Sequence, residues 1–438
     1  MIKALRRTIA VVLATVACAA SAAAQTDTRV PAGAVFGTTR TTTPGQVLNV
    51  TVNLAEAFDQ DVVADIGTAD RSLFAGSGFY TTVTPQLVFG TSGDRLRFGF
   101  NAASDARYYA DLHKLYTTAH SAGIGLIAQL TPSASMSLNQ AVTYSPALFS
   151  GLFAGGATAG LGSVLPSESS YLLESNPSYG YATTANFSQK LSERGSIAFD
   201  ASFRYNDFTG SNPGYADVRS EDVGSRYQYA VSRGLNLRMG YTFRRGQYIG
   251  SLVSTEHNID VGIGYSRPLS RTRKTTFGFG LGPTLASAPL PSGSSQDVRQ
   301  QYRVVADLVL THQMGRTWSV QGAYHRGLGY IEGFQSPVYT AGYATTAGGF
   351  LNRRTDVSLS AAYSTGESLT GSSSPFNTYS GNARLRFALG RMLATYVEYV
   401  FYDYQFNHSI QLPPGIPPAL TRNGVRTGLT LWIPVRSR

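Results

Sequence analysis

The sequence predicts an all-β fold, a transmembrane antiparallel up-and-down β-barrel of about 18 strands, on three observations. Only 14% of the 438 residues are charged, and the mean hydropathy of −0.09 is too polar for a bundle of transmembrane helices. Glycine (46), Tyr (26) and Phe (22) are abundant, whereas Trp (2) is nearly absent. Apolar residues alternate with polar or small ones over segments of about ten residues, which is the pattern of strands with one apolar and one polar face.

The alternation begins near residue 46 and continues to the end of the chain. Ile197, Phe199, Ala201, Phe203 and Tyr205 form one clear example. We expect strands at 46–55, 78–90, 94–104, 121–131, 135–145, 178–191, 195–207, 219–232, 234–245, 255–266, 274–285, 298–312, 316–328, 337–351, 354–365, 376–389, 392–404 and 421–433.

Short and long connections between these segments alternate, which favours a barrel with tight turns at one end and longer loops at the other. If both ends of the chain lie on the side of the tight turns, the number of strands is even. Residues 105–120 are either one of the long loops or extensions of the neighbouring strands. A soluble propeller or a tandem of sandwiches is the alternative, but those folds have shorter strands and no such alternation of loop lengths.

The N-terminal residues 1–24 have the features of a secretory signal peptide. Lys3, Arg6 and Arg7 precede an apolar run from Ile9 to Ala20, and Ala22-Ala23-Ala24 before Gln25 gives a cleavage site. A membrane anchor and a lipoprotein acceptor at Cys18 are the alternatives. We expect a flexible segment at 25–45 and the barrel at 46–438. The mature chain then has no cysteine, which excludes disulfides and thiolate metal sites.

Residues between the apolar positions are expected to face the lumen, and many are arginines. A guanidinium offers a planar fork to carboxylate, phosphate or sulfate, so an excess of them favours anions. The alternative is that they pair with acids of the same parity (Asp200, Asp260, Asp307, Asp356 and Glu398) and stiffen the wall. The inward position also argues against a nucleic-acid partner. The candidate anion-binding residues are Arg95, Arg97, Arg204, Arg226, Arg238, Arg244, Arg303, Arg384, Arg386, Arg422 and Arg426.

The long loop at 146–177 is the candidate constriction of the lumen. It is rich in glycine and carries apolar Leu152, Phe153, Leu172 and Leu173, which a polar outer loop does not require. Packing on the rim of the barrel or on a neighbouring subunit is the alternative.

Aromatic residues cluster near the strand ends, as expected for girdles at the boundary between lipid and water. A track on which sugars stack is the alternative reading. The cluster includes Tyr205, Phe208, Tyr227, Tyr229, Tyr241, Phe243, Tyr399, Phe401, Tyr402 and Tyr404.

No linear catalytic or cofactor motif is present, and we expect neither an enzyme nor a cofactor. Gly278 to Gly282 resembles a glycine-rich loop but lies within an expected strand. Asp59, Asp61 and Asp65 resemble a loose Ca²⁺ site, without the glycine turn and distal Glu of an EF-hand. A Ser, His and Asp assembled from different strands stays open as a third class of function.

The whole mature chain resembles Gram-negative outer-membrane β-barrels, and more loosely the barrels associated with exopolysaccharide loci. The looser resemblance depends on Ala57-Phe58-Asp59-Gln60-Asp61, at the end of the first strand. It implies a conduit for polysaccharide that works with periplasmic export partners. The general resemblance implies an outer-membrane location, lipid contact and the barrel-assembly machinery. The chain departs from it by ending Trp432-Ile433-Pro434-Val435-Arg436-Ser437-Arg438, without a terminal aromatic residue.

These observations predict a porin-like channel for the passive passage of polar, anionic solutes. Exopolysaccharide export is the rival within transport, and a structural or adhesive barrel or a barrel enzyme is the rival outside it.

Overall fold

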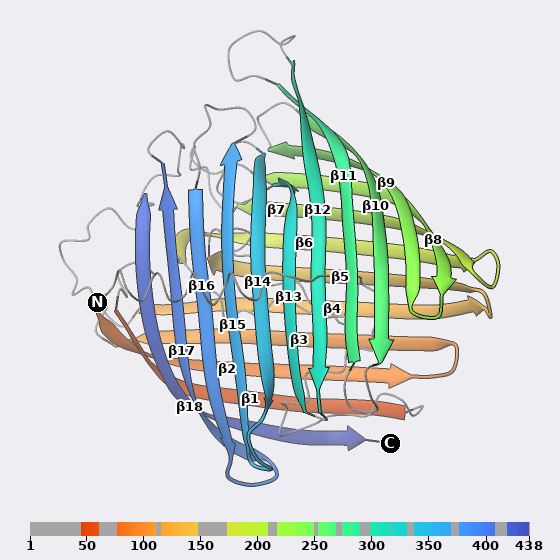
Figure 1. The fold of residues 1–438 in the computed structure, drawn as a ribbon. Coiled ribbons are helices and arrows are strands. Elements are labelled where there is room, and N and C mark those ends of the chain that lie inside the picture. The colour runs from red at the N-terminus through yellow and green to blue at the C-terminus, as the bar shows by residue number, and fades with distance from the viewer. Residues whose placement is uncertain are drawn as a thin grey trace.

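The computed structural model describes residues 45–60, 77–110, 115–147, 173–208, 217–248, 253–268, 274–289, 298–315, 317–330, 337–368, 376–407 and 418–437. These residues form one closed barrel of 18 antiparallel strands (Figure 1). The predicted signal peptide, and all of the predicted flexible segment except Gly45, lie outside the described residues. None of the described residues forms a helix long and apolar enough to cross a membrane.

The strands follow one another around the barrel in chain order. Their bounds are β1 Gly45–Asp59, β2 Gly78–Ser92, β3 Leu96–Tyr109, β4 Leu115–Thr131, β5 Ala134–Ala147, β6 Leu173–Lys190, β7 Gly195–Phe208, β8 Val218–Ser232, β9 Leu235–Tyr248, β10 Ser254–Pro268, β11 Lys274–Pro289, β12 Val298–Met314, β13 Trp318–Gly329, β14 Val338–Phe350, β15 Thr355–Ser368, β16 Phe376–Ala388, β17 Leu393–Phe406 and β18 Ala419–Ser437.

The first and last strands close the barrel. β1 pairs with β18 from Val47↔Ser437 to Asp59↔Gly424, and β1 also pairs with β2 along its length. Closure gives every strand two hydrogen-bonded neighbours, which is the condition for a sheet to cross lipid. The register shifts between Leu48 and Asn49, where Asn49 faces Pro434. A bulge at this position accommodates a residue that has no N–H to donate.

Every predicted strand is present, and the predicted ends differ from the observed ends by a few residues. The largest difference is at 105–120, which extends the two neighbouring strands: β3 continues to Tyr109 and β4 begins at Leu115. The prediction of a long loop at 105–120 is therefore wrong, and the alternative, that the neighbouring strands extend, is confirmed.

The connections differ in length at the two ends of the barrel. At one end they are two to five residues long, and at the other they range from five to 25 residues. β1 begins and β18 finishes at the end with the short turns. We call the end with the long connections the outer end, following the usual asymmetry of outer-membrane barrels.

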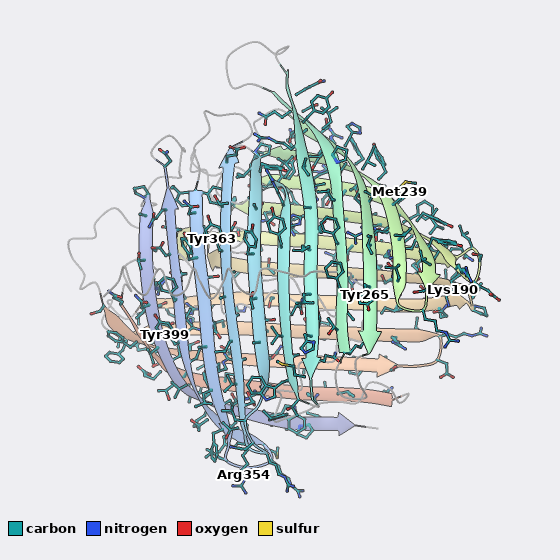
Figure 2. The ribbon with its side chains drawn as sticks, viewed as in Figure 1. Lys190, Met239, Tyr265, Arg354, Tyr363 and Tyr399 are labelled. Carbon is teal, nitrogen blue, oxygen red and sulfur yellow. The ribbon has the colours of Figure 1, made fainter. Side chains whose placement is uncertain are left out.

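The outward face of the strands is apolar. On β9 and β10 it carries Leu237, Met239, Tyr241, Ile259 and Val261, all exposed. Figure 2 shows side chains such as Met239, Tyr265, Tyr363 and Tyr399 along the barrel wall. A soluble monomer does not expose apolar side chains around its whole circumference, because that surface is costly in water. The closed barrel is thus a transmembrane barrel of the outer-membrane type.

Most of the predicted girdle residues lie on the outward face, including Tyr205, Tyr227 and Tyr399. Phe208, Tyr402 and Tyr404 do not: they have lumen parity and are buried. The prediction that these three belong to a girdle is wrong, because proximity to a strand end does not distinguish the two faces of the strand.

Candidate functional site

The candidate site is the inner wall of the barrel, where the predicted arginines fall with one exception. Ten of the eleven lie on strands at positions of lumen parity. Arg95 lies outside the strands, in the turn between β2 and β3, where its carbonyl accepts from the Gln129 N–H. Arg95 is therefore placed at the end of the barrel with the short turns and not on the wall.

Seven of these arginines lie beside a carboxylate. The distances are 2.6 Å from Arg244 to Asp222, 2.6 Å from Arg303 to Glu367, 2.9 Å from Arg386 to Asp356, 3.1 Å from Arg384 to Glu398, 4.0 Å from Arg426 to Glu398, 2.5 Å from Arg422 to Asp59 and 3.6 Å from Arg238 to Asp260. Charge pairing along the wall thus accounts for much of the arginine content.

Glu398 is shared by two arginines from the strands on either side of β17. It forms ion pairs with Arg384 of β16 and Arg426 of β18, and the Asn382 amide donates a hydrogen bond to it. Its side chain is almost fully buried. The group keeps one positive charge in excess, and it fixes three strands to one another near the site of barrel closure.

Arg238 lies flat against the wall, over glycines of the two following strands. A Cβ at Gly280 would come within 1.8 Å of Arg238 Nη2, and one at Gly262 within 2.4 Å of its Nε. Because they have no side chain, these inward-facing glycines leave space beside the wall. In the structure the arginine occupies the space that they leave, so they set the position of a guanidinium.

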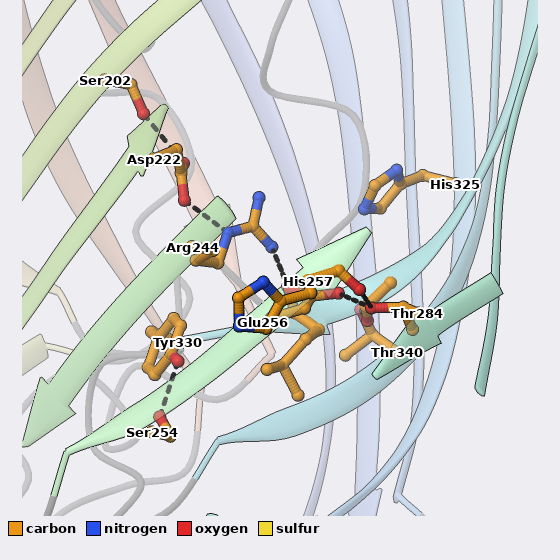
Figure 3. A network of polar contacts seen from close by, with 12 residues as sticks. Ser202, Asp222, Arg244, Ser254, Glu256, His257, Thr284, His325, Tyr330 and Thr340 are labelled. Atoms are coloured by element: carbon orange, nitrogen blue, oxygen red, sulfur yellow. Dashed lines mark hydrogen bonds and ion pairs between the residues drawn. The ribbon is translucent and has the colours of Figure 1, made fainter. Parts of the chain in front are cut away.

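Arg244 is the centre of a larger network on β7 to β11 (Figure 3). Its Nε donates to Asp222 at 2.6 Å, and its Nη1 lies 3.3 Å from Glu256. Ser202 donates to Asp222 and Thr284 donates to Glu256, each at 2.8 Å. The network holds the guanidinium in one orientation. In this orientation Nη1 also donates to a second acceptor.

That acceptor is the backbone carbonyl of Leu328, at 2.6 Å. Leu328 ends β13 together with Gly329, and its side chain packs on Ala286 of β11. The next residue, Tyr330, shares a hydrogen bond of 2.6 Å with the Ser254 hydroxyl of β10. Since Ala286, Ser254 and Arg244 all have lumen parity, residues 328–330 lie inside the barrel. We name them the inner segment.

The ring of Tyr330 requires a glycine beneath it. A Cβ at Gly246 would lie 2.0 Å from Tyr330 Cζ, so only a bare backbone allows this contact. Burial raises the pKa of the Tyr330 hydroxyl to about 12, against the opposing effects of its hydrogen bond with Ser254 and of the nearby Arg244. The hydroxyl is therefore neutral at physiological pH and can keep its hydrogen bond with Ser254.

Most of the loop predicted to constrict the lumen, at 148–172, lies outside the described residues. Leu152, Phe153 and Leu172 lie outside the described residues, and Leu173 is the first residue of β6. Among the described residues, the segment found inside the barrel is the inner segment. In the sequence Gly329 suggests a strand end, and nothing in the alternation indicates that the chain turns to the inside.

Three predicted arginines on the strands stand apart from the paired set. No described carboxylate lies within 4.0 Å of Arg97, Arg204 or Arg226. Arg97 and Arg204 are exposed, and Arg226 is partly buried with an Nε that has no hydrogen-bond partner. Arg204 lies near the outer end of β7, Arg226 near the middle of β8 and Arg97 near the turn end of β3.

Several wall residues were not found from the sequence. Arg107 and Asp105 form a buried pair at 2.8 Å on β3, and Asp59, Asp222 and Glu256 each bind an arginine. Their strand parity could have indicated a lumen position. Asp59 in particular was assigned to an acidic turn or a loose Ca²⁺ site, whereas it is a strand residue paired with Arg422. Asp61 and Asp65 lie outside the described residues.

The histidines do not form a metal site in the described part of the chain, where no three His, Cys, Asp or Glu residues cluster. His120, His257 and His312 lie at outward parity beside hydroxyl groups of Ser104, Tyr241 and Thr275. His325 has lumen parity, with its Nδ1 2.5 Å from Asp307 Oδ1, and both side chains are about 60% exposed. His113 and His408 are not among the described residues.

Comparison with known proteins gives matches among solved structures alone. No family model and no curated protein matches the chain. The barrel is similar to the crystal structure of Acinetobacter baumannii OccAB2, with 10% identity, 89% of this chain and 98% of that chain covered, and a TM-score of 0.45. For Pseudomonas aeruginosa OpdQ the identity is 10%, the coverage 89% and 98%, and the TM-score 0.44. None of these matches supports the suggested link to exopolysaccharide export.

Proposed function

We propose that the barrel is a channel through which small polar solutes cross the outer membrane, with a preference for anions. A barrel of this strand number encloses an aqueous lumen, narrowed where a segment folds inside. The inner segment is such a narrowing.

The observation that carries the anion preference is the difference between paired and unpaired arginines. A guanidinium beside a carboxylate contributes little net field, whereas no described carboxylate lies within 4.0 Å of Arg97, Arg204 or Arg226. They stand at three heights along the axis, near the outer end, the middle and the turn end. An anion in transit therefore meets a positive group at each level, and the surrounding low-dielectric wall strengthens that attraction.

The test is a triple variant, Arg97→Gln with Arg204→Gln and Arg226→Gln, refolded and inserted into planar bilayers. We expect the reversal potential in a potassium chloride gradient to move toward that of potassium. The matched control is Arg194→Gln with Arg353→Gln and Arg354→Gln, three exposed arginines of the short turns. It removes the same charge from the protein outside the lumen. If both triples shift the reversal potential equally, or neither does, the three lumen arginines do not set selectivity.

A further inference from the structure

The barrel wall is interrupted on one side of its outer end. β12 and β13 pair from Met314↔Trp318 up to Ala306↔Arg326. Above that level β12 continues to Val298, paired with β11 as far as Pro289. Among the described residues, no backbone pairing joins 298–305 of β12 to β13 or β14. We name this gap, between 298–305 of β12 on one side and the outer ends of β13 and β14 on the other, the seam.

The seam exists because the end of β13 leaves the wall for the lumen. Gly327 to Gly329 still pair with β14, opposite Thr340 to Val338. Leu328 meanwhile packs on Ala286 of β11, and its carbonyl is bound by Arg244 of β9. The end of β13 therefore passes along the inside of β12 and does not continue beside it.

Side chains, not a backbone ladder, close the seam. The Tyr339 hydroxyl of β14 donates to the Val304 carbonyl of β12. Arg303 of β12 reaches Glu367 of β15 at 2.6 Å, and these two side chains are 32% and 29% exposed. The contacts among the described residues, a partly exposed ion pair and one hydroxyl hydrogen bond, are far weaker than a backbone ladder.

Two cations flank the tyrosine that fills the seam. The guanidinium carbons of Arg303 and Arg326 lie 5.3 and 5.4 Å from the centre of the Tyr339 ring. Glu367 is the one carboxylate paired with either of them in the described chain. The described residues of the seam thus carry a net positive charge beside an aromatic ring.

The lower edge of the seam, at Ala306↔Arg326, lies two residues beyond a row of tyrosines on the outer side. Tyr324, Tyr343 and Tyr363 lie side by side on β13 to β15, with ring centres 4.6 and 6.2 Å apart. Tyrosine rows of this kind lie at headgroup level. Arg326 is the next position on the same face of β13, and on the lumen side His325 and Asp307 are both exposed.

We propose that the seam is a lateral opening between the lumen and the outer leaflet, for an amphiphile with an anionic head and one acyl chain. Arg303 and Arg326 bind the head, Tyr339 swings aside, and the chain remains in the lipid until the head has entered the lumen. This route goes beyond axial passage of small solutes and does not depend on it.

The test locks the seam reversibly in a Cys18→Ser background. Arg303→Cys and Glu367→Cys are bridged with a bis-methanethiosulfonate reagent and released with a reductant. The probe is a diazirine-bearing dodecanoic acid, photolysed with the protein in lipid nanodiscs. Mass spectrometry measures its attachment to lumen-facing residues of β13 such as Gln321 and His325. We expect bridging to lower this labelling severalfold and the reductant to restore it.

The control pair is Thr345→Cys with Ala361→Cys, directly opposite each other on the intact β14–β15 ladder. Bridging there is expected to leave lumen labelling unchanged. Lumen labelling that is absent, or that is insensitive to bridging of the seam, would overturn the proposal.

A second comparison, between an acid probe and an alcohol probe, tests whether the seam prefers an anionic head. The acid is expected to label the lumen more than the matching diazirine-bearing alcohol, and Arg326→Gln to reduce that difference. Equal labelling by acid and alcohol would refute anionic recognition. Ion conductance of the same bridged samples is expected to stay unchanged. A barrel that does not conduct but labels through the seam would refute the axial channel and leave this inference standing.

Discussion

Asp59 and Arg422 form an ion pair of 2.5 Å between the first strand and the last, 363 residues apart in sequence. Both side chains are nearly inaccessible, at 7% and 3% exposure, and the Tyr402 hydroxyl accepts a further hydrogen bond from Arg422. The pair lies at the outer end of the β1–β18 contact, where the register ends at Asp59↔Gly424. It fixes the closure of the barrel at the level where the ladder stops.

Asp59→Asn is expected to destabilise the barrel, because it removes the carboxylate charge that pairs with the buried guanidinium of Arg422. Removing one partner of a buried pair costs roughly 3 kcal/mol. Equilibrium unfolding in urea from lipid vesicles measures the change. Asp94→Asn, exposed in the β2–β3 turn, is the control and should change stability by less than about 0.5 kcal/mol. Equal stability of the two variants would show that the pair does not secure the closure.

Glu398→Gln is expected to make the channel more selective for anions. It removes the one carboxylate that Arg384 and Arg426 share, so the positive charge of the group rises by one. The reversal potential in a salt gradient reports the change. Glu193→Gln, in the turn between β6 and β7, removes the same charge outside the lumen and should leave selectivity unchanged. A shift toward cations in Glu398→Gln would contradict the charge assignment.

Gly246→Ala is expected to displace the inner segment and raise single-channel conductance, roughly twofold if the segment forms the narrowest level of the lumen. The added methyl group would lie 2.0 Å from Tyr330 Cζ, too close for the ring to stay. Gly381→Ala on the outward face, whose Cβ would be 3.8 Å from its nearest neighbour, is the matched control. Unchanged conductance in Gly246→Ala would show that the inner segment does not limit flow.

Gly280→Ala is expected to push Arg238 off the wall, since its Cβ would lie 1.8 Å from Nη2. Overpacking of this kind costs about 1–3 kcal/mol. The guanidinium moves farther from Asp260 and into the lumen, which favours anions in the reversal potential. Gly322→Ala, with open space around its Cβ, serves as the control. A stability loss without any change in selectivity would leave Arg238 as a purely structural residue.

The strands were predictable because a membrane barrel repeats one simple rule along the chain. Each strand faces lipid on one side and water on the other, so Leu237, Met239 and Tyr241 alternate with Asn236, Arg238 and Gly240. The same parity placed ten of the eleven arginines on the inner wall. Arg95 has the same parity but lies in a turn, because parity does not show where a strand begins.

The ion-pair partners of the arginines could not be predicted from the sequence, because they depend on the register of strands that are distant in the chain. Nothing local to Arg422 indicates Asp59, and nothing near Arg244 indicates that Leu328 offers it a carbonyl. The inner segment was missed for the same reason. Gly329 and Tyr330 are ordinary at a strand end, and the residue against which Tyr330 packs is Gly246, more than eighty residues earlier.

The reversal potential of the unmodified channel in a potassium chloride gradient tests the central claim most directly. Unpaired Arg97, Arg204 and Arg226 predict a value on the chloride side of zero. A value on the potassium side, or a refolded barrel that passes no current at all, would contradict an arginine-selected channel.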